Sequence, residues 1–339
     1  MTVRERMLKV LNFEKPDRLP VFELSGWWDK TYKNWFEQGI DKDAFWRDSY
    51  SYMGMDKHLG LFIPSENENY DYKDGAGNIE KESDYEPFKE RCLFPSGYVK
   101  KNAEMFKFVA YGHERGDYSV WLNFQGFFWF PRTVFGIEGH LYAFYDFPDL
   151  MKRMNAEYLE HLMGELNDYF EIDIPDFVVI SEDMSYNHGP MCSKETFDEF
   201  IAPYYRPIMK MFKERGIKVL VDTDGNATDM IDWFLELGVD GFTPNERRAG
   251  TDIVKIREKY PDLLLMGGFD KNIMNQGEEA IRAEFERIYP VMCQGGYIPG
   301  CDHQTPPQVS IHNYFEYQRV QREYCKKAAE NFIGKGKCK

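Results

Sequence analysis

The chain has 339 residues, of which 43% are hydrophobic and 17% aromatic, enough to bury one large core or two smaller ones. Its net charge of -15 excludes the usual kind of nucleic-acid binder, because such proteins carry basic patches that release counterions from phosphate backbones. No stretch approaches the ~18 consecutive apolar residues of a membrane span, and the first residues do not read as a signal peptide. We therefore expect a single cytoplasmic domain over residues 1–339 that binds neither nucleic acid nor membrane.

The N-terminal region predicts a helix that leads into the first strand of a sheet. The helix is expected over residues 3–13 and the strand over residues 21–24. The prolines between them mark the boundary, because the residue before a proline is biased away from helix. Residues 26–118 show no clear order of elements, and we interpret them as a loop and hairpin elaboration.

The middle of the chain predicts a second strand and two helices. The strand is expected over residues 118–124, with Gln125 and the glycine after it ending the strand. The helices are expected between residues 139 and 170, and Pro148 is suited to the first position of the second helix. From there on, strand and helix patterns alternate.

Five apolar runs of strand length in the second half end abruptly in polar side chains. These are residues 177–180 before Glu182 and Asp183, 217–221 before Asp222 and Asp224, 239–243 before Asn245 and Glu246, 263–266 before Asp270 and Lys271, and 296–299 before Cys301 and His303. Helical patterns separate the runs, which is typical of a parallel barrel whose strand C-termini open onto one face. We therefore predict an α/β fold, a (β/α)8 TIM-type barrel with N-terminal loop and hairpin elaborations, in which these polar residues are neighbours.

The most distinctive motif is Asp222-Thr-Asp224-Gly-Asn, which follows the second of these runs. Asp222 and Asp224 are two residues apart, so in extended geometry both side chains point to the same side. Two ionised carboxylates repel each other, and a bound cation, a shared proton or a hydrogen-bond donor relieves the repulsion. The same residue types are common in plain turns and helix caps, so a structural role is the alternative.

Two acidic motifs at other strand ends leave a choice open. At least one of Glu182 and Asp183 is expected to face the pocket as a base or as a partner for a cationic group. Which one does so depends on register, since a shift of one residue exchanges them. Asp270 and Lys271 fit either a pocket pair or a surface ion pair that contributes little to stability.

His303 is the only one of seven histidines that lies at a predicted strand end. An imidazole in this position could serve as acid, base or metal ligand. Cys301, two residues earlier, could join it, or could be a small buried apolar group, as free cysteine often is.

A series of segments in fixed order along the chain carries a likeness to a known family. They are Arg18-Leu-Pro-Val21, Tyr142-Ala-Phe-Tyr145 before Pro148, Glu182-Asp183-Met184 with Gly189-Pro190, Phe200 to Tyr205, Asp222-x-Asp224-Gly225-Asn226, Gly267-Gly268-x-Asp270-Lys271, and Gly296-Tyr297-Ile298-Pro299 with Asp302-His303. Together they resemble the uroporphyrinogen decarboxylase superfamily over nearly the whole chain. The likeness is nearest to the branch related to cobalamin-dependent methyltransferases, and it implies a TIM-type barrel more firmly than it implies a function.

One departure separates the branches of this superfamily. True decarboxylases carry an arginine-rich segment soon after the first strand, which binds the carboxylates of the porphyrinogen. Residues 23–32 contain no arginine here, and acids dominate the later strand ends. A polyanionic substrate would meet repulsion, so porphyrinogen decarboxylation is disfavoured.

A second departure concerns the metal. The zinc methyltransferases of this superfamily use a His-x-Cys pair at one strand end and a second Cys near the last strand. The matching positions here are Asp222, Asp224 and Cys301. Carboxylates shift preference towards harder cations than zinc. The resemblance therefore implies either a divalent metal, such as zinc, on these three residues, with His303 as a further ligand, or metal-free acid/base work by the same groups.

The resemblance implies a methyltransferase-like enzyme that moves a methyl group between a small methylated substrate or acceptor and a corrinoid (cobalamin) protein as partner. The catalytic candidates, which would deliver or take a proton, are His303, Glu182, Asp183 and Asp270. The substrate-binding candidates are Trp28, Gln125, Asn245, Glu246 and Lys271.

Two other interpretations stay open. A decarboxylase or related lyase of a small carboxylic acid would use a carboxylic acid to protonate the carbanion that forms. A catalytically silent ligand-binding barrel is the other, because Asp222 and Asp224 stand where the zinc enzymes have His and Cys. Dimerisation is common in this superfamily, so a homodimer is a further expectation from the resemblance.

Overall fold

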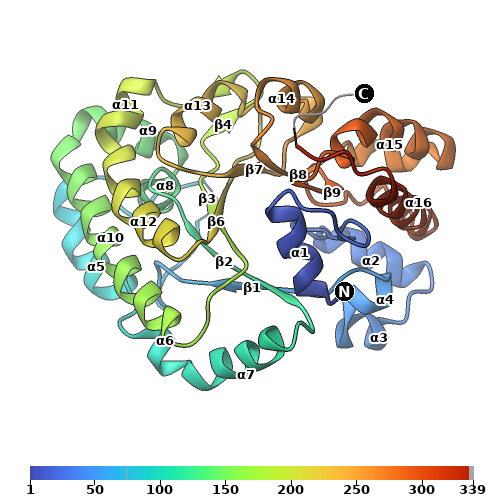
Figure 1. Cartoon of the computed structure of the whole chain (residues 1–339). Helices are drawn as coiled ribbons and strands as arrows, with labels where there is room; N and C mark the ends of the chain where they lie inside the picture. The colour runs from blue at the N-terminus through green and yellow to red at the C-terminus, as the bar shows by residue number, and fades with distance from the viewer. Residues whose placement is uncertain (74, 336–339) are drawn as a thin grey trace.

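The computed structural model describes residues 1–73 and 75–335, and a seven-stranded parallel sheet forms its centre (Figure 1). The strand order is β1-β2-β3-β6-β7-β8-β9. The strands are β1 (His58–Phe62), β2 (Ser119–Gln125), β3 (Phe177–Ser181), β6 (Lys218–Asp222), β7 (Gly241–Thr243), β8 (Leu264–Phe269) and β9 (Tyr297–Cys301). Two short strands, β4 (Ser185–Tyr186) and β5 (Gly189–Pro190), pair in antiparallel fashion just after β3.

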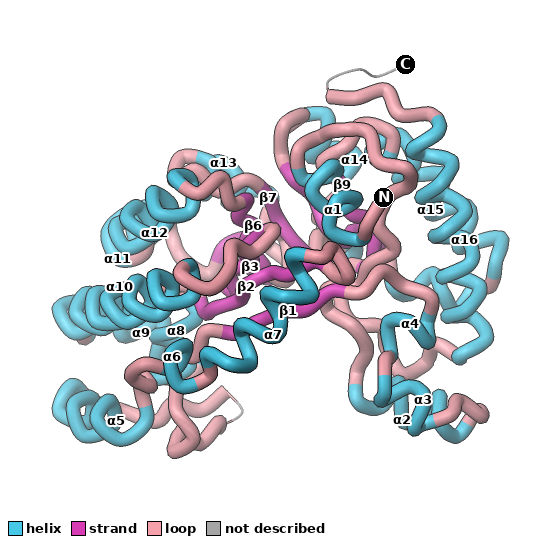
Figure 2. The backbone as a smooth tube through the Cα atoms, turned by 60° about the horizontal axis from the view of Figure 1, so that its bottom comes forward, coloured by secondary structure: helices cyan, strands magenta, loops and turns pink. Residues whose placement is uncertain are grey.

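Helices surround the curved sheet on its outer side (Figures 1 and 2). The helices are α1 (Val3–Leu11), α2 (Asp29–Glu37), α3 (Lys42–Arg47), α4 (Ser49–Met53), α5 (Tyr85–Cys92), α6 (Tyr98–Lys101), α7 (Ala103–Glu114), α8 (Trp129–Phe135), α9 (Ile137–Asp146), α10 (Pro148–Phe170), α11 (Lys194–Phe200), α12 (Ala202–Glu214), α13 (Ile231–Leu235), α14 (Ile253–Lys259), α15 (Glu278–Met292) and α16 (Ile311–Glu330). Figure 2 shows the strands in the middle, with α10 to α12 on one side and α15 and α16 on the other. Among the described residues, no helix is long and apolar enough to cross a membrane.

An extended segment takes the eighth place of the barrel, between β9 and β1. The sequence predicts a strand over residues 21–24, but the structure forms none there. The Val21 amide donates to the Asp56 carboxylate at 2.9 Å, and the Val21 carbonyl accepts from the Asp56 amide at 2.9 Å, so both groups bind one residue instead of a strand ladder. On the other side, a Cβ on Gly300 would lie 2.7 Å from the Phe22 carbonyl oxygen, which shows how closely the segment packs on β9.

The N-terminal elaboration differs from the expectation. The described part of residues 26–118 contains no hairpin and is instead built from β1 and the helices α2 to α7. Several of these helices have only four to six residues, too few to show a hydrophobic period. The strand β1 escaped the analysis because Gly60 interrupts it, and a Cβ there would lie 2.5 Å from the Trp121 ring.

The later elements match the sequence analysis closely. The five predicted strands of the second half are present, and four of them reach one to three residues further towards the polar residues than predicted. Pro148 begins α10, as its position suggested. Buried apolar residues such as Val219 and Val221 fill β6 up to the point where Asp222 ends it. The carboxyl ends of the strands therefore gather polar groups on one face, while α1 covers the opposite end of the barrel.

The helix α1 is tied to that opposite end by two long-range contacts. Arg4 lies 2.9 Å from Asp176, the residue just before β3. The Val10 carbonyl accepts from the Gly296 amide, just before β9, at 3.1 Å. The amino ends of the strands are thus closed by structure, and chemistry is expected at the carboxyl ends.

Candidate active site

A cavity of about 210 Å³ lies at the carboxyl ends of the strands. Its lining residues are Ser25, Trp129, Ser181, Asp183, Asp222, Thr223, Asp224 and His303. They come from the segment beside β1, the start of α8, the ends of β3 and β6, and the loop after β9. The lining holds three carboxyl groups and no Lys or Arg. The volume lies below the ~300 Å³ at which typical ligand pockets begin, so the cavity suits a small substrate.

The loop after β6 is shaped by one threonine and one glycine. The Thr223 hydroxyl accepts from the Met184 amide at 3.1 Å and lies 3.0 Å from the Ser185 hydroxyl. Gly225 has a φ of +82°, and a Cβ there would lie 2.6 Å from the Tyr186 backbone. Only glycine fits this close approach, and the turn that follows from it keeps Asp224 beside Asp222 at the cavity.

Asp222 presents a carboxyl group to the cavity without a hydrogen-bond partner among the described residues. Burial raises its pKa to about 8, and the neighbouring charges of Asp224 and Asp183 add to the effect, while His303 opposes it. A carboxylic acid with such a pKa keeps its proton at neutral pH and can donate it. Asp222 is therefore the best-placed acid of the cavity.

His303 and Asp224 form a pair on the cavity wall. The imidazole Nε2 lies 3.2 Å from an Asp224 carboxylate oxygen. The hydrogen bond to Asp224 raises the pKa of His303, which burial and the charge of Lys271 oppose. The Asp224 carboxylate therefore favours the protonated form of His303 at the cavity wall.

Asp183 faces the cavity in a left-handed backbone conformation, with a φ of +40°. Arg132 donates to its carbonyl at 3.1 Å and lies 3.5 Å from its carboxylate. The same guanidinium lies over the Trp129 ring, 4.6 Å from the centroid. Burial, together with the charge of Asp224, raises the pKa of Asp183, and Arg132 opposes the rise.

Glu182, the neighbour of Asp183, points away from the cavity into the protein. Its side chain is fully buried and accepts hydrogen bonds from the Tyr205 hydroxyl at 2.6 Å and from the amides of Phe128 and Trp129 at 2.9 and 3.1 Å. Burial raises its pKa to about 7, while the hydroxyl and the amides oppose the rise. The geometry therefore decides between the two acids: the Asp183 side chain lines the cavity and the Glu182 side chain does not.

Glu246 and Lys271 form an ion pair beside the cavity. The ammonium lies 3.1 Å from the Glu246 carboxylate and 3.9 Å from that of Asp302. The other Glu246 oxygen accepts from the Gly225 amide at 3.2 Å. These two predicted binding residues do not line the cavity, and they act on it through their charges, which shift the pKa of His303 in opposite directions.

Four further predicted site residues lie outside the cavity lining. Asp270 accepts from the Asn272 amide at 2.9 Å, at the start of the 3-10 helix η4 (Lys271–Gln276), and pairs with Arg248 at 3.0 Å. The Asn245 amide group donates to the carbonyls of Phe242 and Met266 at 2.9 and 2.8 Å.

Gln125 and Trp28 complete this set. Gln125 accepts from Ser65 at 2.8 Å and donates to Glu66 at 2.9 Å, so both its amide oxygen and its amide nitrogen have a partner within the protein. Trp28 precedes α2 and is 40% exposed. The sequence placed Asp270, Asn245 and Gln125 correctly at strand ends, but the directions of all four side chains assign them to packing or to the surface.

Cys301 does not join the carboxylates of the cavity. Its side chain is buried with the sulfur 3.8 Å from the Thr305 hydroxyl, and burial raises the pKa of its thiol well above the usual range. Its amide donates to Glu23 at 2.9 Å. Within residues 1–73 and 75–335, no group of three or more His, Cys, Asp or Glu side chains is arranged to hold a metal ion. The expected ligand set of Asp222, Asp224 and Cys301 does not fit a metal here, and we derive no step through one.

Three cavity residues were missing from the predicted site: Ser25, Ser181 and Thr223. Ser181 pairs in register with Asp222 across β3 and β6, so its direction follows once the strands are aligned. Trp129 comes soon after the end of β2, in an aromatic patch that the sequence allows either to line the mouth of the site or to belong to the core, and it lines the cavity. Neutral side chains carry a weaker chemical signal than acids, which is why they were passed over.

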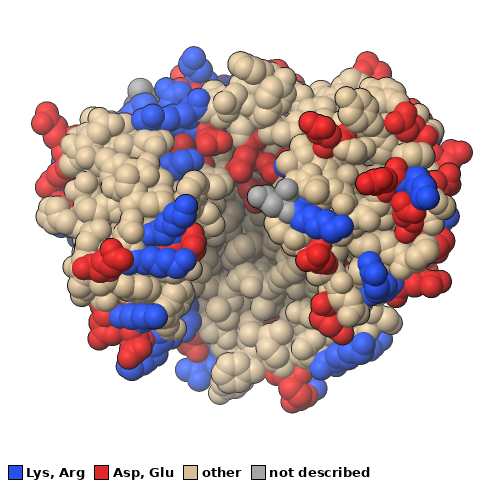
Figure 3. Space-filling view, turned by 180° about the vertical axis from the view of Figure 1, so that it is seen from behind, with Lys and Arg blue, Asp and Glu red and all other residues tan. Residues whose placement is uncertain are grey.

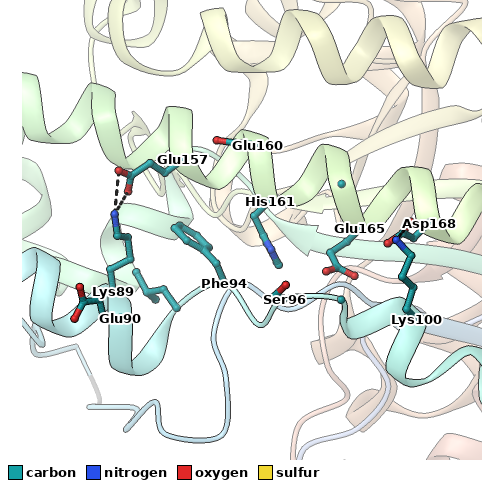
Figure 4. Close-up of a pocket in the computed structure, with 13 residues that line it drawn as sticks. Lys89, Glu90, Phe94, Ser96, Lys100, Glu157, Glu160, His161, Glu165 and Asp168 are labelled. Carbon is teal, nitrogen blue, oxygen red and sulfur yellow. Dashed lines mark hydrogen bonds and ion pairs between the residues drawn. The ribbon is translucent and has the colours of Figure 1, made fainter.

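A larger groove, of about 760 Å³, lies on the outer side of the barrel between α10 and the segment of α5 and α6 (Figure 4). Both of its lysines are paired within the protein: Lys89 lies 3.1 Å from Glu157 and Lys100 lies 2.9 Å from Asp168. Glu165 accepts from two backbone amides at the start of α6. None of the predicted site residues lines this groove, so it is not the candidate active site.

The view from behind shows a deep groove with mostly uncharged walls and acidic side chains at its upper end (Figure 3). Next to the 210 Å³ cavity, a smaller hollow of about 140 Å³ shares Trp129 with it and is also lined by Tyr70 and Tyr72. Trp129 therefore borders both the small acidic cavity and this second hollow.

Comparisons with known proteins agree with this architecture. The uroporphyrinogen decarboxylase (URO-D) family model matches residues 149–324, just over half of the 339 residues. A solved structure, a methyltransferase from Methanosarcina mazei, is similar at 14% identity with a TM-score of 0.64, covering 96% of this chain and 99% of that chain. A GH5-4 broad specificity endoglucanase from Clostridium longisporum aligns at 12% identity over 98% and 99% of the chains, but its TM-score of 0.34 carries no argument. No curated protein matches the sequence. At its low identity the first likeness shows the fold alone, and it confirms the predicted TIM-type barrel.

Proposed function

This chain belongs to the uroporphyrinogen decarboxylase family, and we propose that it is a methyltransferase-like enzyme that transfers a methyl group from a small methylated substrate to a corrinoid protein. The observation that carries the proposal is the cavity itself. It is small, it contains Asp222 without a hydrogen-bond partner among the described residues, and its lining includes an indole and no Lys or Arg. The overall likeness to the methyltransferase from Methanosarcina mazei supports the same class of reaction.

The charge of the cavity favours methyl transfer over decarboxylation. A decarboxylase must hold an anionic carboxylate substrate, usually through Arg or Lys side chains. Here the nearest cations are already paired, Arg132 with Asp183 and Lys271 with Glu246. An anionic substrate would therefore find no unpaired Lys or Arg in the cavity lining to bind its charge.

The residues of the cavity can supply the proton that methyl transfer requires. A methyl group bonded to oxygen or nitrogen leaves poorly unless the heteroatom is protonated. In the proposed reaction the proton moves from the Asp222 carboxyl to that heteroatom while the bond between the heteroatom and the methyl carbon breaks. His303, paired with Asp224, then supplies the proton that reprotonates the Asp222 carboxylate. When bound, the corrinoid supplies the nucleophile that accepts the methyl group.

The surface around the cavity fits a large apolar partner group. Three exposed aromatic side chains are available, namely Phe62 (42% exposed) at the end of β1, Tyr72 (69%) in the segment that follows β1, and Tyr186 (47%) on β4. Tyr72 and Trp129 both line the hollow beside the cavity. Aromatic faces suit contact with a flat macrocycle, which is how these residues would hold the corrinoid of the partner protein.

The test is a methyl-transfer assay with the purified protein, reduced cobalamin and a panel of methylated amines and methyl ethers. Methylation of the corrinoid, followed by its absorbance, is expected with at least one donor and is expected to be lost in Asp222→Asn. Asp270→Asn, a change at a paired acid outside the cavity, is the matched control and should retain activity. Release of CO2 from a small carboxylic acid, without methyl transfer, would replace the proposal with a decarboxylase. Binding of a donor without any turnover would favour a silent binding barrel.

A further inference from the structure

We propose that Glu182 is a positioning residue for this reaction, whose buried carboxyl fixes the start of α8 and so holds the Trp129 ring as one wall of the cavity. The inference rests on the proposed function for its kinetic consequences, but its structural part stands independently of it. Glu182 was expected from the sequence to transfer protons. The geometry points instead to a role that acts through Trp129.

One oxygen of Glu182 holds the first residues of α8. It accepts from the amides of Phe128 at 2.9 Å and Trp129 at 3.1 Å. The first amides of a helix have no partner within the helix, and a buried one must find a partner elsewhere. Phe128 is fully buried, so no water replaces the carboxyl there. The position of the Trp129 backbone therefore depends on where the Glu182 carboxyl lies.

The carboxyl is itself held from two other sides. Its second oxygen accepts from the Tyr205 hydroxyl at 2.6 Å, and Tyr205 is a fully buried residue of α12. At Gly126, a Cβ would lie 2.1 Å from the Glu182 carboxylate and 2.7 Å from the Tyr205 oxygen. A side chain at residue 126 would displace the Glu182 carboxyl, so only glycine fits at this position.

The neighbouring acid, Asp183, also contributes to holding the Trp129 ring in place. Asp183 binds Arg132 on α8, and the Arg132 guanidinium lies over the Trp129 ring at 4.6 Å. The two adjacent acids at the end of β3 thus hold α8 in two ways. Glu182 accepts hydrogen bonds from its first backbone amides, and Asp183 pairs with Arg132, the side chain that covers the indole. A shift at the start of α8 would move the indole and the partner of a cavity carboxyl together.

Two substitutions at Glu182 separate the roles of shape and charge. In Glu182→Gln, the amide oxygen can accept from both backbone amides and the NH2 group can donate to the Tyr205 oxygen, so the wall should stay in place. In Glu182→Ala, the two amides and the hydroxyl lose their partner. We expect Glu182→Ala to raise the KM for the methyl donor by about tenfold with kcat changed by less than about threefold, the pattern of lost uniform binding. Glu182→Gln should keep both constants within about twofold of the wild type.

The decisive test is a double-mutant cycle with Trp129→Ala. If Glu182 acts through the indole, adding Glu182→Ala to Trp129→Ala should leave KM unchanged. A purely structural role would instead give independent effects, with each substitution multiplying KM, and that result would overturn the inference. Loss of kcat in Glu182→Gln with KM unchanged would also overturn it, because it would indicate proton transfer.

A measurement without turnover keeps the inference separate from the proposed function. The fluorescence of Trp129, taken as the difference between matched proteins with and without Trp129→Phe, should become more accessible to acrylamide in Glu182→Ala and stay as in the wild type in Glu182→Gln. This result would support the positioning role even if no donor is turned over, and equal quenching in all three proteins would refute it. If Glu182→Ala does not fold, Tyr205→Phe removes one of the three contacts and should give the same change in smaller measure.

Discussion

Two groups of acids near the carboxyl ends of the strands, one buried and one facing the cavity, differ in how many hydrogen bonds their carboxyl groups accept. In the packed group, Glu23, Glu182 and Asp302, each carboxyl accepts at least two hydrogen bonds from backbone amides or a tyrosine hydroxyl. In the cavity group, Asp183, Asp222 and Asp224, Asp222 has no hydrogen-bond partner among the described residues, while Asp183 lies beside Arg132 and Asp224 lies beside the His303 imidazole. The packed group holds the barrel together, and the cavity group is free to act on a substrate.

The comparison shows that a shifted pKa does not by itself identify a functional acid. Burial raises the pKa of Glu23 and Glu182 to about 7 and that of Asp302 to about 6, although all three face the protein interior. Asp222, with a pKa of about 8, differs from them in facing a cavity. The distinguishing feature of Asp222 is that its carboxyl faces a cavity and has no hydrogen-bond partner among the described residues.

The largest expected effect is on activity. Asp222→Asn should lower kcat/KM for methyl transfer by about 10²- to 10⁴-fold, because an amide cannot donate the proton that a carboxylic acid supplies. Glu23→Gln, the matched change in the packed group, should alter kcat/KM by less than about threefold. The measurement is steady-state methyl transfer on both variants, with circular dichroism to show that each is folded. Equal losses in the two variants would remove the distinction between the groups.

The reverse contrast is expected for stability. Glu23→Ala should lower the free energy of unfolding by about 2 to 4 kcal/mol, because it leaves the buried Tyr317 hydroxyl and the Cys301 amide without their acceptor. Asp224→Asn, at an acid that is 43% exposed, should change it by less than about 0.5 kcal/mol. Urea unfolding of both variants measures this. A larger loss in Asp224→Asn than in Glu23→Ala would contradict the assignment.

A smaller effect concerns stability and pH at Asp222. Its pKa is about 8 in the folded chain against an ordinary value of 3.8, so the folded state holds a proton that the unfolded state has released. The tighter binding of this proton in the folded state contributes to the free energy of unfolding at low pH, and the contribution is lost as pH rises from about 4 to about 8. Asp222→Asn removes the penalty, so at pH 8 it should be about 1 to 2 kcal/mol more stable than the wild type, with little difference at pH 4. Thermal unfolding at the two pH values checks this, and an equal shift at both would refute the sign.

The smallest effect is expected at Cys301. Cys301→Ser should change methyl-transfer activity by less than about threefold, because the sulfur lies against Thr305 and not at the cavity. Elemental analysis of the wild type and this variant, purified without chelators, gives the independent check. Loss of both activity and about one bound metal per chain in the variant would restore the metal-ligand interpretation of Asp222, Asp224 and Cys301.

The sequence was sufficient for the barrel and for the core of the site. Alternation of apolar runs and helical patterns located five strands, and their polar ends brought Asp183, Asp222, Asp224 and His303 to one cavity. This succeeded because strand ends in a parallel barrel share one face, so that position along the chain translates directly into proximity.

What failed was the direction of single side chains. Asp183 turns into the cavity because its backbone adopts a φ of +40°, and Glu182 stays inside the protein. No pattern of residues in the sequence predicts this backbone conformation. Cys301 and His303 are two residues apart, yet only His303 lines the cavity, because the chain leaves the strand at residue 301 and no longer alternates. The Trp129 wall depends on a contact with an acid more than 50 positions away, which a single sequence does not reveal.

The pH dependence of methyl transfer by the wild type and by Asp222→Asn tests the central claim most directly. Asp222 is proposed to act in its protonated form, with a pKa of about 8. The wild-type rate should therefore fall as pH rises through about 8, and the residual rate of Asp222→Asn should lack this fall. The same fall in both proteins, or a wild-type rate that rises with pH over this range, would contradict the role of Asp222 as the acid of the reaction.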